Sequence, residues 1–324
     1  IKDGYKPEVR ELVIGKDVTY FRLYQLPYDL PSPDFFDSFE TAEYDKNGRS
    51  QYGYYRLNDL FPRKISVDDE NGTFQVIDGL LINQQTGELV LSETGMVMVV
   101  IPKGVRSITR KAFYQRDLIS VQFPSSLETI GEYAFARCTE IKSVSLPNSV
   151  VELKQGAFYD CTNLQRLSLP QNLTVIADSA FGYSAIQQIE IPAQVTKISF
   201  DAFLECDKLQ KVVLPDGLKR IESGAFGSCD QLSSINLPNG LEYIGRGAFE
   251  FCKSLKVVIL PDSVQQVGDA LFWGCDLSVL RIPSKLAFPI YSEKKRAYIL
   301  NVHTKRNKSF ELSSVDTVIL AGSD

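Results

Sequence analysis

Six cysteines are the residues of this sequence best suited to chemistry, because a thiolate binds metal ions, attacks electrophiles and forms disulfides. They lie 23 or 45 residues apart, at Cys138, Cys161, Cys206, Cys229, Cys252 and Cys275. Ser184 divides the one long interval, and Arg116 precedes the series by 22 residues. All eight residues therefore occupy one position of a repeat.

This regular spacing argues against a metal site or a set of disulfides. Side chains at one position of a stacked repeat run parallel, whereas a disulfide or a zinc tetrahedron needs side chains that converge. No C-x-x-C pair is present either. We therefore predict buried free thiols that pack as small hydrophobic side chains, and no metal ion or other cofactor.

The remaining residues give no catalytic constellation. The only histidine, His303, is predicted to be a surface or packing residue, and no spacing marks two carboxylates as an acid/base couple. There is no glycine-rich phosphate loop and no G-x-S-x-G motif. We predict that the chain has no catalytic residues and is not an enzyme. Its net charge of −5 argues against nucleic acid as a partner.

Prolines reveal the elements that position these side chains. Nine of them recur every 22 or 23 residues, at Pro102, Pro124, Pro147, Pro170, Pro192, Pro215, Pro238, Pro261 and Pro283. Each follows a short apolar run. A period of this length is typical of a solenoid, in which every unit must stack on its neighbours to bury its apolar face.

Each unit reads as one strand followed by a turn. In the unit that begins at Leu232, the apolar residues Ile235 and Leu237 alternate with polar ones, which predicts a strand buried on one side. The unit strands should form a parallel sheet along the whole array. An Ala-Phe pair then follows, as at Ala157-Phe158, and the stacked copies predict a phenylalanine column inside the solenoid.

The repeat resembles the BspA-type leucine-rich repeats. The resemblance rests on the segments from Leu146 to Cys161 and from Leu237 to Leu255, and on an introductory Asp78-Gly79-Leu80-Leu81 hairpin motif. It implies a right-handed, mainly β leucine-rich-repeat solenoid of about eight to nine units with a cap at each end. It also implies a cell-surface or secreted protein that binds or adheres without catalysis of its own.

Three regions are expected. Residues 77–283 form the repeat array, residues 1–76 an N-terminal cap, and residues 284–324 a C-terminal β cap with strands at 297–302, 310–312 and 315–320. Degenerate repeat units are predicted at Val9–Phe21 and at Ile65–Val67. An aromatic, acidic insertion covers residues 24–55. Its carboxylates at Asp34, Asp37, Glu40 and Glu43 read as a solvated charge run, although they could attract a cation or a basic partner.

The exposed strand positions are the predicted binding surface, because the repeated residues are needed for the core. The candidate partner-binding residues lie towards the C-terminal end and combine apolar, polar and cationic side chains: Lys211, Val213, Asn236, Val257, Ile259, Val279 and Arg281. Exposed apolar patches often mark interaction sites. The alternative is that these β-branched residues simply favour strands and that the C-terminal segment folds over them.

Aromatic residues near the turn are a second, weaker candidate. They are Tyr114, Tyr159, Tyr183, Phe251 and Trp273, and in the sequence they are scattered over several units. We therefore expect them to pack under the turns.

The sequence thus predicts a surface protein that recognises a host matrix protein or a glycan through its sheet. No apolar stretch reaches 18 residues, so no membrane span is expected. Two alternatives remain open. One is a structural spacer or self-assembling module, and the other is a carboxylate-dependent hydrolase that uses the N-terminal insertion.

Overall fold

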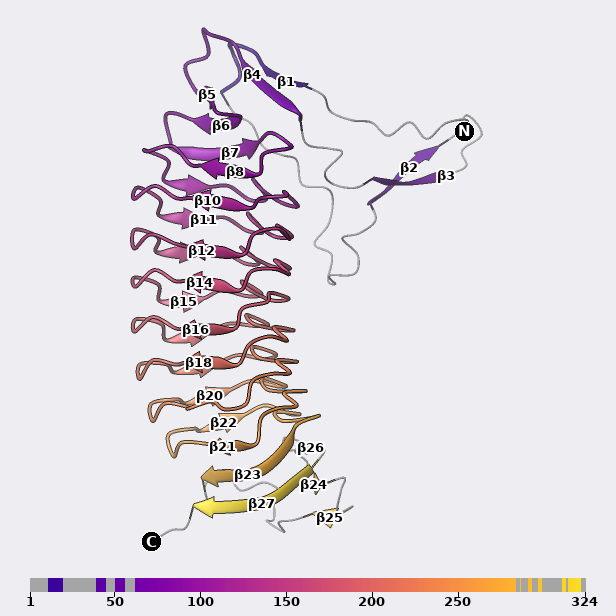
Figure 1. Cartoon of the computed structure of the whole chain (residues 1–324), viewed down its shortest axis with the longest axis vertical. Helices are drawn as coiled ribbons and strands as arrows, with labels where there is room; N and C mark the ends of the chain where they lie inside the picture. The colour runs from indigo at the N-terminus through magenta and orange to yellow at the C-terminus, as the bar shows by residue number, and fades with distance from the viewer. Residues whose placement is uncertain are drawn as a thin grey trace.

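The protein is a parallel β-solenoid of about eight turns, seen in a computed structural model (Figure 1). The structure describes residues 11–19, 39–44, 50–55, 62–283, 286, 291–292, 297–298, 311–312 and 314–321. No α-helix occurs among these residues. The predicted solenoid fold is confirmed.

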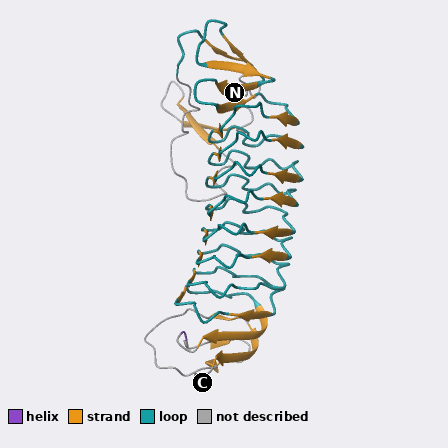
Figure 2. Cartoon of the chain, turned by 90° about the vertical axis from the view of Figure 1, so that its left-hand side faces the viewer, coloured by secondary structure: helices purple, strands orange, loops and turns teal. Residues whose placement is uncertain are grey.

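One strand per turn lies along a long side of the solenoid, which we call the strand face (Figure 2). These strands are β8 (Met98–Val100), β10 (Ser120–Gln122), β12 (Ser143–Ser145), β14 (Arg166–Ser168), β16 (Gln188–Glu190), β18 (Lys211–Val213), β21 (Val257–Ile259) and β23 (Asp276–Pro283). In most of them the middle residue is buried and its two neighbours are exposed, as in β12, β16, β18 and β21. This is the predicted alternation.

The expectation of one continuous sheet along the strand face is wrong. The ladder is divided into β8–β10, β12–β14, β16–β18 and β21–β23–β27. In the turn that starts at Leu232, the strand is reduced to a single bridge between Ser234 and Val257. A three-residue strand offers few ladder hydrogen bonds, so a small offset between neighbouring turns is enough to end the ladder.

A second series of strands, which the side-chain pattern did not predict, lies beside the strand face. We call it the lateral sheet: β9 (Ser107–Ile108), β11 (Thr129–Ile130), β13 (Glu152–Leu153), β15 (Val175–Ile176), β17 (Lys197–Ile198), β19 (Arg220–Ile221), β20 (Tyr243–Ile244) and β22 (Gln266–Val267). Two residues are too few to show an alternating pattern. The lateral sheet is interrupted between β13 and β15, where a groove of about 420 Å³ opens.

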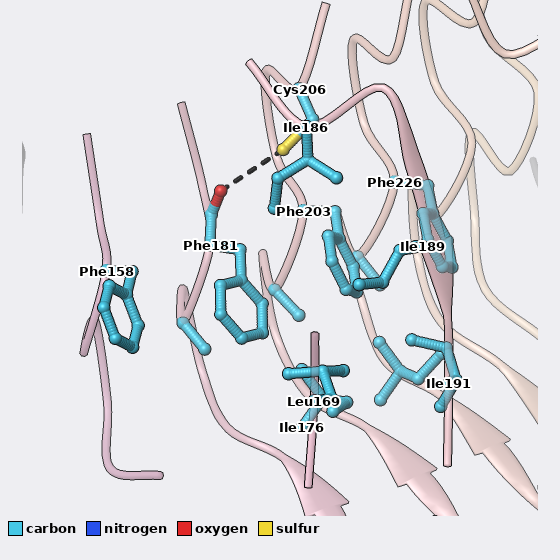
Figure 3. Close-up of a cluster of buried hydrophobic side chains, with 14 of the residues drawn as sticks. Phe158, Leu169, Ile176, Phe181, Ile186, Ile189, Ile191, Phe203, Cys206 and Phe226 are labelled. Atoms are coloured by element: carbon cyan, nitrogen blue, oxygen red, sulfur yellow. Dashed lines mark hydrogen bonds between the residues drawn. The ribbon is translucent and has the colours of Figure 1, made fainter. Parts of the chain in front are cut away.

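The core is the predicted phenylalanine column. Eight rings, from Phe113 to Phe272, are fully buried and stack with centroids 4.9 to 6.1 Å apart. Figure 3 shows part of this column, with isoleucine and leucine side chains packed beside the rings. The widest step, between Phe158 and Phe181, lies in the two turns that carry the interruption of the lateral sheet.

The Ala-Phe turns stack through backbone hydrogen bonds. The N–H of Phe135 donates to the carbonyl of Ala157 at 2.9 Å, and Phe158 repeats this bond with Ala180. The small alanine lets neighbouring turns approach closely. In every turn the residue before Ala and the second residue after Phe are left-handed; Ser179 and Tyr183, for example, have φ values of 51° and 60°. Non-glycine residues rarely adopt this conformation, and the repeat imposes it twice per turn.

The N-terminal end is a meander that joins the lateral sheet. Strands β5 (Phe74–Ile77) and β6 (Leu80–Asn83) pair antiparallel around Asp78 and Gly79, both with positive φ, and β7 (Glu88–Ser92) follows. Two such residues between paired strands form the tight turn of a two-residue hairpin. β1 (Glu11–Ile14) pairs parallel with β4 (Lys64–Val67), and these strands lie in the two segments predicted as degenerate repeat units.

At the C-terminal end, β27 (Ser314–Ala321) pairs parallel with β23 and confirms the strand predicted at 315–320. The strands β24 (Tyr291–Ser292), β25 (Ala297–Tyr298) and β26 (Glu311–Leu312) form a small separate sheet. The predicted insertion contains an antiparallel hairpin, β2 (Phe39–Tyr44) with β3 (Ser50–Tyr55). The rest of residues 24–55 lies outside the described residues.

Candidate functional site

The C-terminal part of the strand face brings most of the predicted binding residues together. Val257 and Ile259 of β21 are 45% and 54% exposed, and their register partners in β23 are Val279 and Arg281. Val279 and Arg281 are half-buried. The structure thus forms an apolar surface centred on β21, with β23 as its less exposed border.

The other predicted residues continue this surface one and two turns towards the N-terminus. Ser234 and Asn236 are exposed in the turn next to β21. Lys211 and Val213 of β18 follow, and Val213 is 43% exposed. The apolar patch is therefore interrupted by a polar turn.

The C-terminal segment does not fold over this patch within the described part of the chain. β27 pairs with the free edge of β23, where Thr317 is the partner of Val279 and Ile319 the partner of Arg281. A strand added at the edge widens the sheet in its own plane and does not lie across its face. Val257 and Ile259 consequently keep their exposure, and the alternative that the tail covers them is wrong for the described residues.

Two cations at the C-terminal border of this surface form polar contacts within the molecule. Arg281 donates from Nη1 to the carbonyl of Leu260 at 3.3 Å, and its Nη2 lies 3.4 Å from Asp262 Oδ1. Lys256 Nζ lies 3.0 Å from Asp276 Oδ2. Their positive charge is thus partly balanced within the molecule.

A second apolar patch lies at the N-terminal end of the strand face, and sequence reasoning missed it. It consists of Val97, Met98, Val100 and Ile119, which are 43%, 71%, 61% and 56% exposed. β8 pairs with β10 in register, so these residues lie on neighbouring turns. The sequence pattern could have predicted this patch, because Met98 and Val100 occupy the same two solvent-facing repeat positions as Ser120 and Gln122, one turn earlier.

The aromatic residues near the turns contact one another, which the sequence did not suggest. Tyr159 and Tyr183 contact each other with centroids 5.3 Å apart, and Phe251 contacts Trp273 at 5.2 Å. Tyr133, which sequence reasoning missed, lies 6.4 Å from Tyr159. The expectation that these residues are scattered is wrong, because different offsets within successive turns bring their rings together. Burial raises the pKa of both Tyr133 and Tyr159 above the ordinary value for tyrosine.

The cysteine column is structural, as predicted. All six thiols are free and buried, and each donates to the carbonyl of a phenylalanine of an adjacent turn at 2.9 to 3.2 Å, as Cys206 does to Phe181 in Figure 3. Burial raises the pKa of Cys138 to about 12 and that of Cys206 to about 11. A protonated, inaccessible thiol is a poor nucleophile and a poor metal ligand.

The first turn replaces this cysteine with Arg116. Its side chain is buried, and Nε donates to Ser92 Oγ at 3.2 Å. Ser92 Oγ in turn donates to the carbonyl of Ala112. The arginine therefore joins the first Ala-Phe turn to β7, where the thiol column ends.

Other residues considered for chemistry contribute no site within the described structure. No group of three His, Cys, Asp or Glu residues suited to a metal ion occurs there. No helix in that part of the chain is long and apolar enough to cross a membrane. His303, Asp34 and Asp37 lie outside the described residues, and only the backbone of Glu40 and Glu43 is described.

Comparisons with known proteins agree with this geometry. A family model described as "BspA type Leucine rich repeat region" matches six copies, over residues 86–206 and 174–289, which together exceed half of the chain. No curated protein matches the sequence.

Solved structures of bacterial repeat proteins are similar. A leucine-rich repeat protein from Eubacterium ventriosum shares 21% identity and a TM-score of 0.53, over 82% of this chain and 59% of that one. A leucine rich cell surface protein from Faecalibacterium prausnitzii shares 21% identity with a TM-score of 0.34, over 79% and 97% of the two chains. The pneumococcal vaccine antigen PcpA shares 19% with a TM-score of 0.45, over 86% and 73%. The first of these likenesses shows the solenoid fold, and this chain spans about three fifths of that protein's length.

Proposed function

The chain belongs to the BspA-type leucine-rich repeat family, and from that premise we propose that it is a non-catalytic adhesion protein, located at the cell surface or secreted. In this proposal it recognises a host protein or glycan through the strand face. The supporting observation is that apolar side chains remain exposed there although the interior is fully packed: Ile259 is 54% exposed, while the neighbouring Val258 is fully buried. Apolar surface of this kind often marks a binding site.

We propose the residues around β21 as the partner-contacting centre. Val257 and Ile259 supply the apolar middle, and Lys211, Asn236 and Arg281 supply a polar border. Val279 extends the apolar surface into β23, and Val213 adds an apolar side chain beyond the polar turn of Ser234 and Asn236. An apolar centre within a polar rim is the usual composition of a protein interface, in which a few central residues carry most of the binding energy.

The proposal is tested by binding to immobilised matrix proteins, mucins and polysaccharides at physiological salt. We expect a saturable partner whose binding is abolished by Val257→Asp combined with Ile259→Asp. The matched control is Val151→Asp with Val175→Asp, because these valines are exposed at 52% and 38% but flank the groove of the lateral sheet. Binding that the control removes equally, or no binding at all, contradicts adhesion through the strand face.

One observation favours the alternative of a self-assembling module. Within the described residues, β27 is paired on one side only, at the end of the order β21-β23-β27. An open edge strand presents backbone donors and acceptors to a second chain. Sedimentation velocity over a hundredfold concentration range tests this alternative: a growing sedimentation coefficient supports it, and a constant monomer value rejects it.

A further inference from the structure

The strand face differs in charge from the protein as a whole. The chain carries a net charge of −5. At the solvent-facing positions of the strand face and at the residue that precedes each of these strands, cations predominate: Lys142, Arg166, Lys211, Lys256 and Arg281, against the two carboxylates Glu190 and Asp276. A surface that is cationic on an acidic protein has a local potential opposite to that of its surroundings.

Three of these cations lack an ion pair within the described residues. Lys256 and Arg281 are balanced by Asp276 and Asp262. By contrast, Lys142, Arg166 and Lys211 are exposed. None of the ion pairs among the described residues involves them. Their charge is therefore available to a partner.

The three cations lie on the central turns of the array. The backbone N–H of Arg166 donates to the carbonyl of Lys142 at 3.3 Å, which places these residues on adjacent turns. Lys211 follows on β18, paired in register with Gln188. Most neighbouring exposed positions carry serine or glutamine, as at Ser143 and Ser168, and Glu190 is the one carboxylate among the exposed residues of β12, β14, β16 and β18. The three cations therefore outnumber the negative charge around them.

Aliphatic side chains flank this cationic centre. Met98, Val100 and Ile119 are exposed towards the N-terminus, and Val257 and Ile259 towards the C-terminus. No strand-face position from Met98 to Arg281 carries phenylalanine, tyrosine or tryptophan. The face therefore lacks the aromatic rings on which sugars stack, whereas methionine, valine and isoleucine suit the apolar side chains of a protein.

We propose that the strand face binds an acidic polypeptide surface, in which carboxylates meet Lys142, Arg166 and Lys211 and aliphatic residues meet the two apolar patches. This inference rests on the proposed adhesion function and narrows its partner from protein or glycan to an acidic protein. An anionic polysaccharide would satisfy the cations but would leave the five aliphatic side chains against hydroxyl groups, at a cost in desolvation.

The test uses defined probes with the whole chain. They are three synthetic peptides of equal length and leucine content, whose other residues are glutamate, glutamine or lysine, and heparin as an anionic polysaccharide. We expect the Glu–Leu peptide to bind at least about tenfold more tightly than the Gln–Leu peptide, and the Lys–Leu peptide not to bind. Because salt screens exposed charges, binding of the Glu–Leu peptide should weaken about tenfold or more between 0.1 and 0.5 M NaCl.

A charge-matched pair of variants locates the effect. Replacing Lys142, Arg166 and Lys211 with glutamine should weaken binding of the Glu–Leu peptide at least about tenfold. The control replaces Lys103, Arg106 and Lys154 with glutamine, which removes the same charge from exposed residues off the strand face and should change binding less than about twofold. Equal losses in both variants, or a preference for heparin over the Glu–Leu peptide, overturn the proposal.

The same variants separate this inference from the proposed function. A natural partner whose capture needs Val257 and Ile259 but tolerates loss of the three cations and 0.5 M NaCl leaves adhesion intact and refutes the acidic partner. A partner that tolerates both sets of changes refutes the strand face as the binding surface, and the acidic-partner inference with it.

Discussion

The interior of this solenoid keeps the same residue types from one turn to the next, whereas the strand face changes them. Inside, one position holds phenylalanine in eight successive turns, from Phe113 to Phe272, and each ring stacks on its neighbours. On the strand face, a single exposed column changes from Ser143 to Arg166, Gln188, Lys211 and Val257. An interior ring must fit two neighbours at once, whereas an exposed strand residue needs only to tolerate the extended backbone.

In a repeat protein, the constant positions and the variable positions have different roles. The residues that define the repeat, including the cysteines, whose type is best suited to chemistry, serve the core. The cysteine thiols are buried and hydrogen-bonded to phenylalanine carbonyls, as in Cys229 with Phe203. What distinguishes one part of the solenoid from another lies at the positions that break the repeat.

The largest effect of a substitution on stability is expected in the phenylalanine column. Phe226→Ala should lower the free energy of unfolding by about 3 to 5 kcal/mol, because it removes a fully buried ring and leaves a cavity. Urea unfolding followed by circular dichroism measures the loss. Phe200→Ala is the control, since Phe200 is 47% exposed and should cost about 1 kcal/mol or less. Similar losses in both variants would remove the distinction between the two regions.

Alkaline pH should lower the stability of the folded protein through its buried thiols. Burial raises the pKa of Cys138 from 9.0 to about 12, so folding favours the protonated thiol. This contribution is complete below pH 9 and is lost as the pH rises from about 9 to 12. Urea midpoints measured from pH 8 to 11 should fall for the wild type.

The control for this pH dependence is Cys138→Ser, because a serine hydroxyl does not titrate in this range. Its midpoint should fall less steeply than that of the wild type between pH 9 and 11. Parallel curves for the two proteins would show that ionisation of this thiol does not contribute.

Removing one thiol donor should have an intermediate effect. Cys229→Ala leaves the carbonyl of Phe203 without its hydrogen bond and creates a small void, which should cost about 1 to 2 kcal/mol. Cys229→Ser keeps a donor and should cost less, as Ser184 already occupies the same column. Thermal unfolding compares the two variants, and a serine variant less stable than the alanine variant contradicts the donor role.

The smallest expected effect tests the left-handed turn positions. Ser228 has a φ of 55°, so Ser228→Gly should relieve strain and raise stability by up to about 1 kcal/mol. Ser143→Gly in β12 is the matched control, and there glycine should destabilise by about 0.5 to 1 kcal/mol through lost backbone entropy. Equal changes in the melting temperatures would show that the turn conformation stores no strain.

Several features could be predicted from the sequence because stacking repeats them. The proline spacing predicted the solenoid, the Ala-Phe pairs predicted the ring column, and the single cysteine position predicted free thiols, all of which the structure confirms. Each rests on a residue that must occur at the same depth in turn after turn. A signal repeated eight times remains clear without any alignment of relatives.

The exposed surface could be predicted only in part. The alternation of β18 and β21 correctly placed Val213, Val257 and Ile259 outside. The N-terminal patch at Met98 and Val100 was not predicted, although both residues occupy solvent-facing repeat positions of the first turn. The contacts of Tyr133 with Tyr159 and of Phe251 with Trp273 were also missed, because ring contacts depend on how neighbouring turns are offset in space.

The architecture and the interior follow from the amino-acid pattern, because a solenoid core is built from local patterns that recur at a fixed period. The lateral sheet, the left-handed turns and the path of β27 emerge only when the turns stack in space; β27 extends the sheet beside β23 and leaves Val257 and Ile259 exposed. These features depend on contacts between residues 20 or more positions apart, and side-chain patterns within one unit do not encode them.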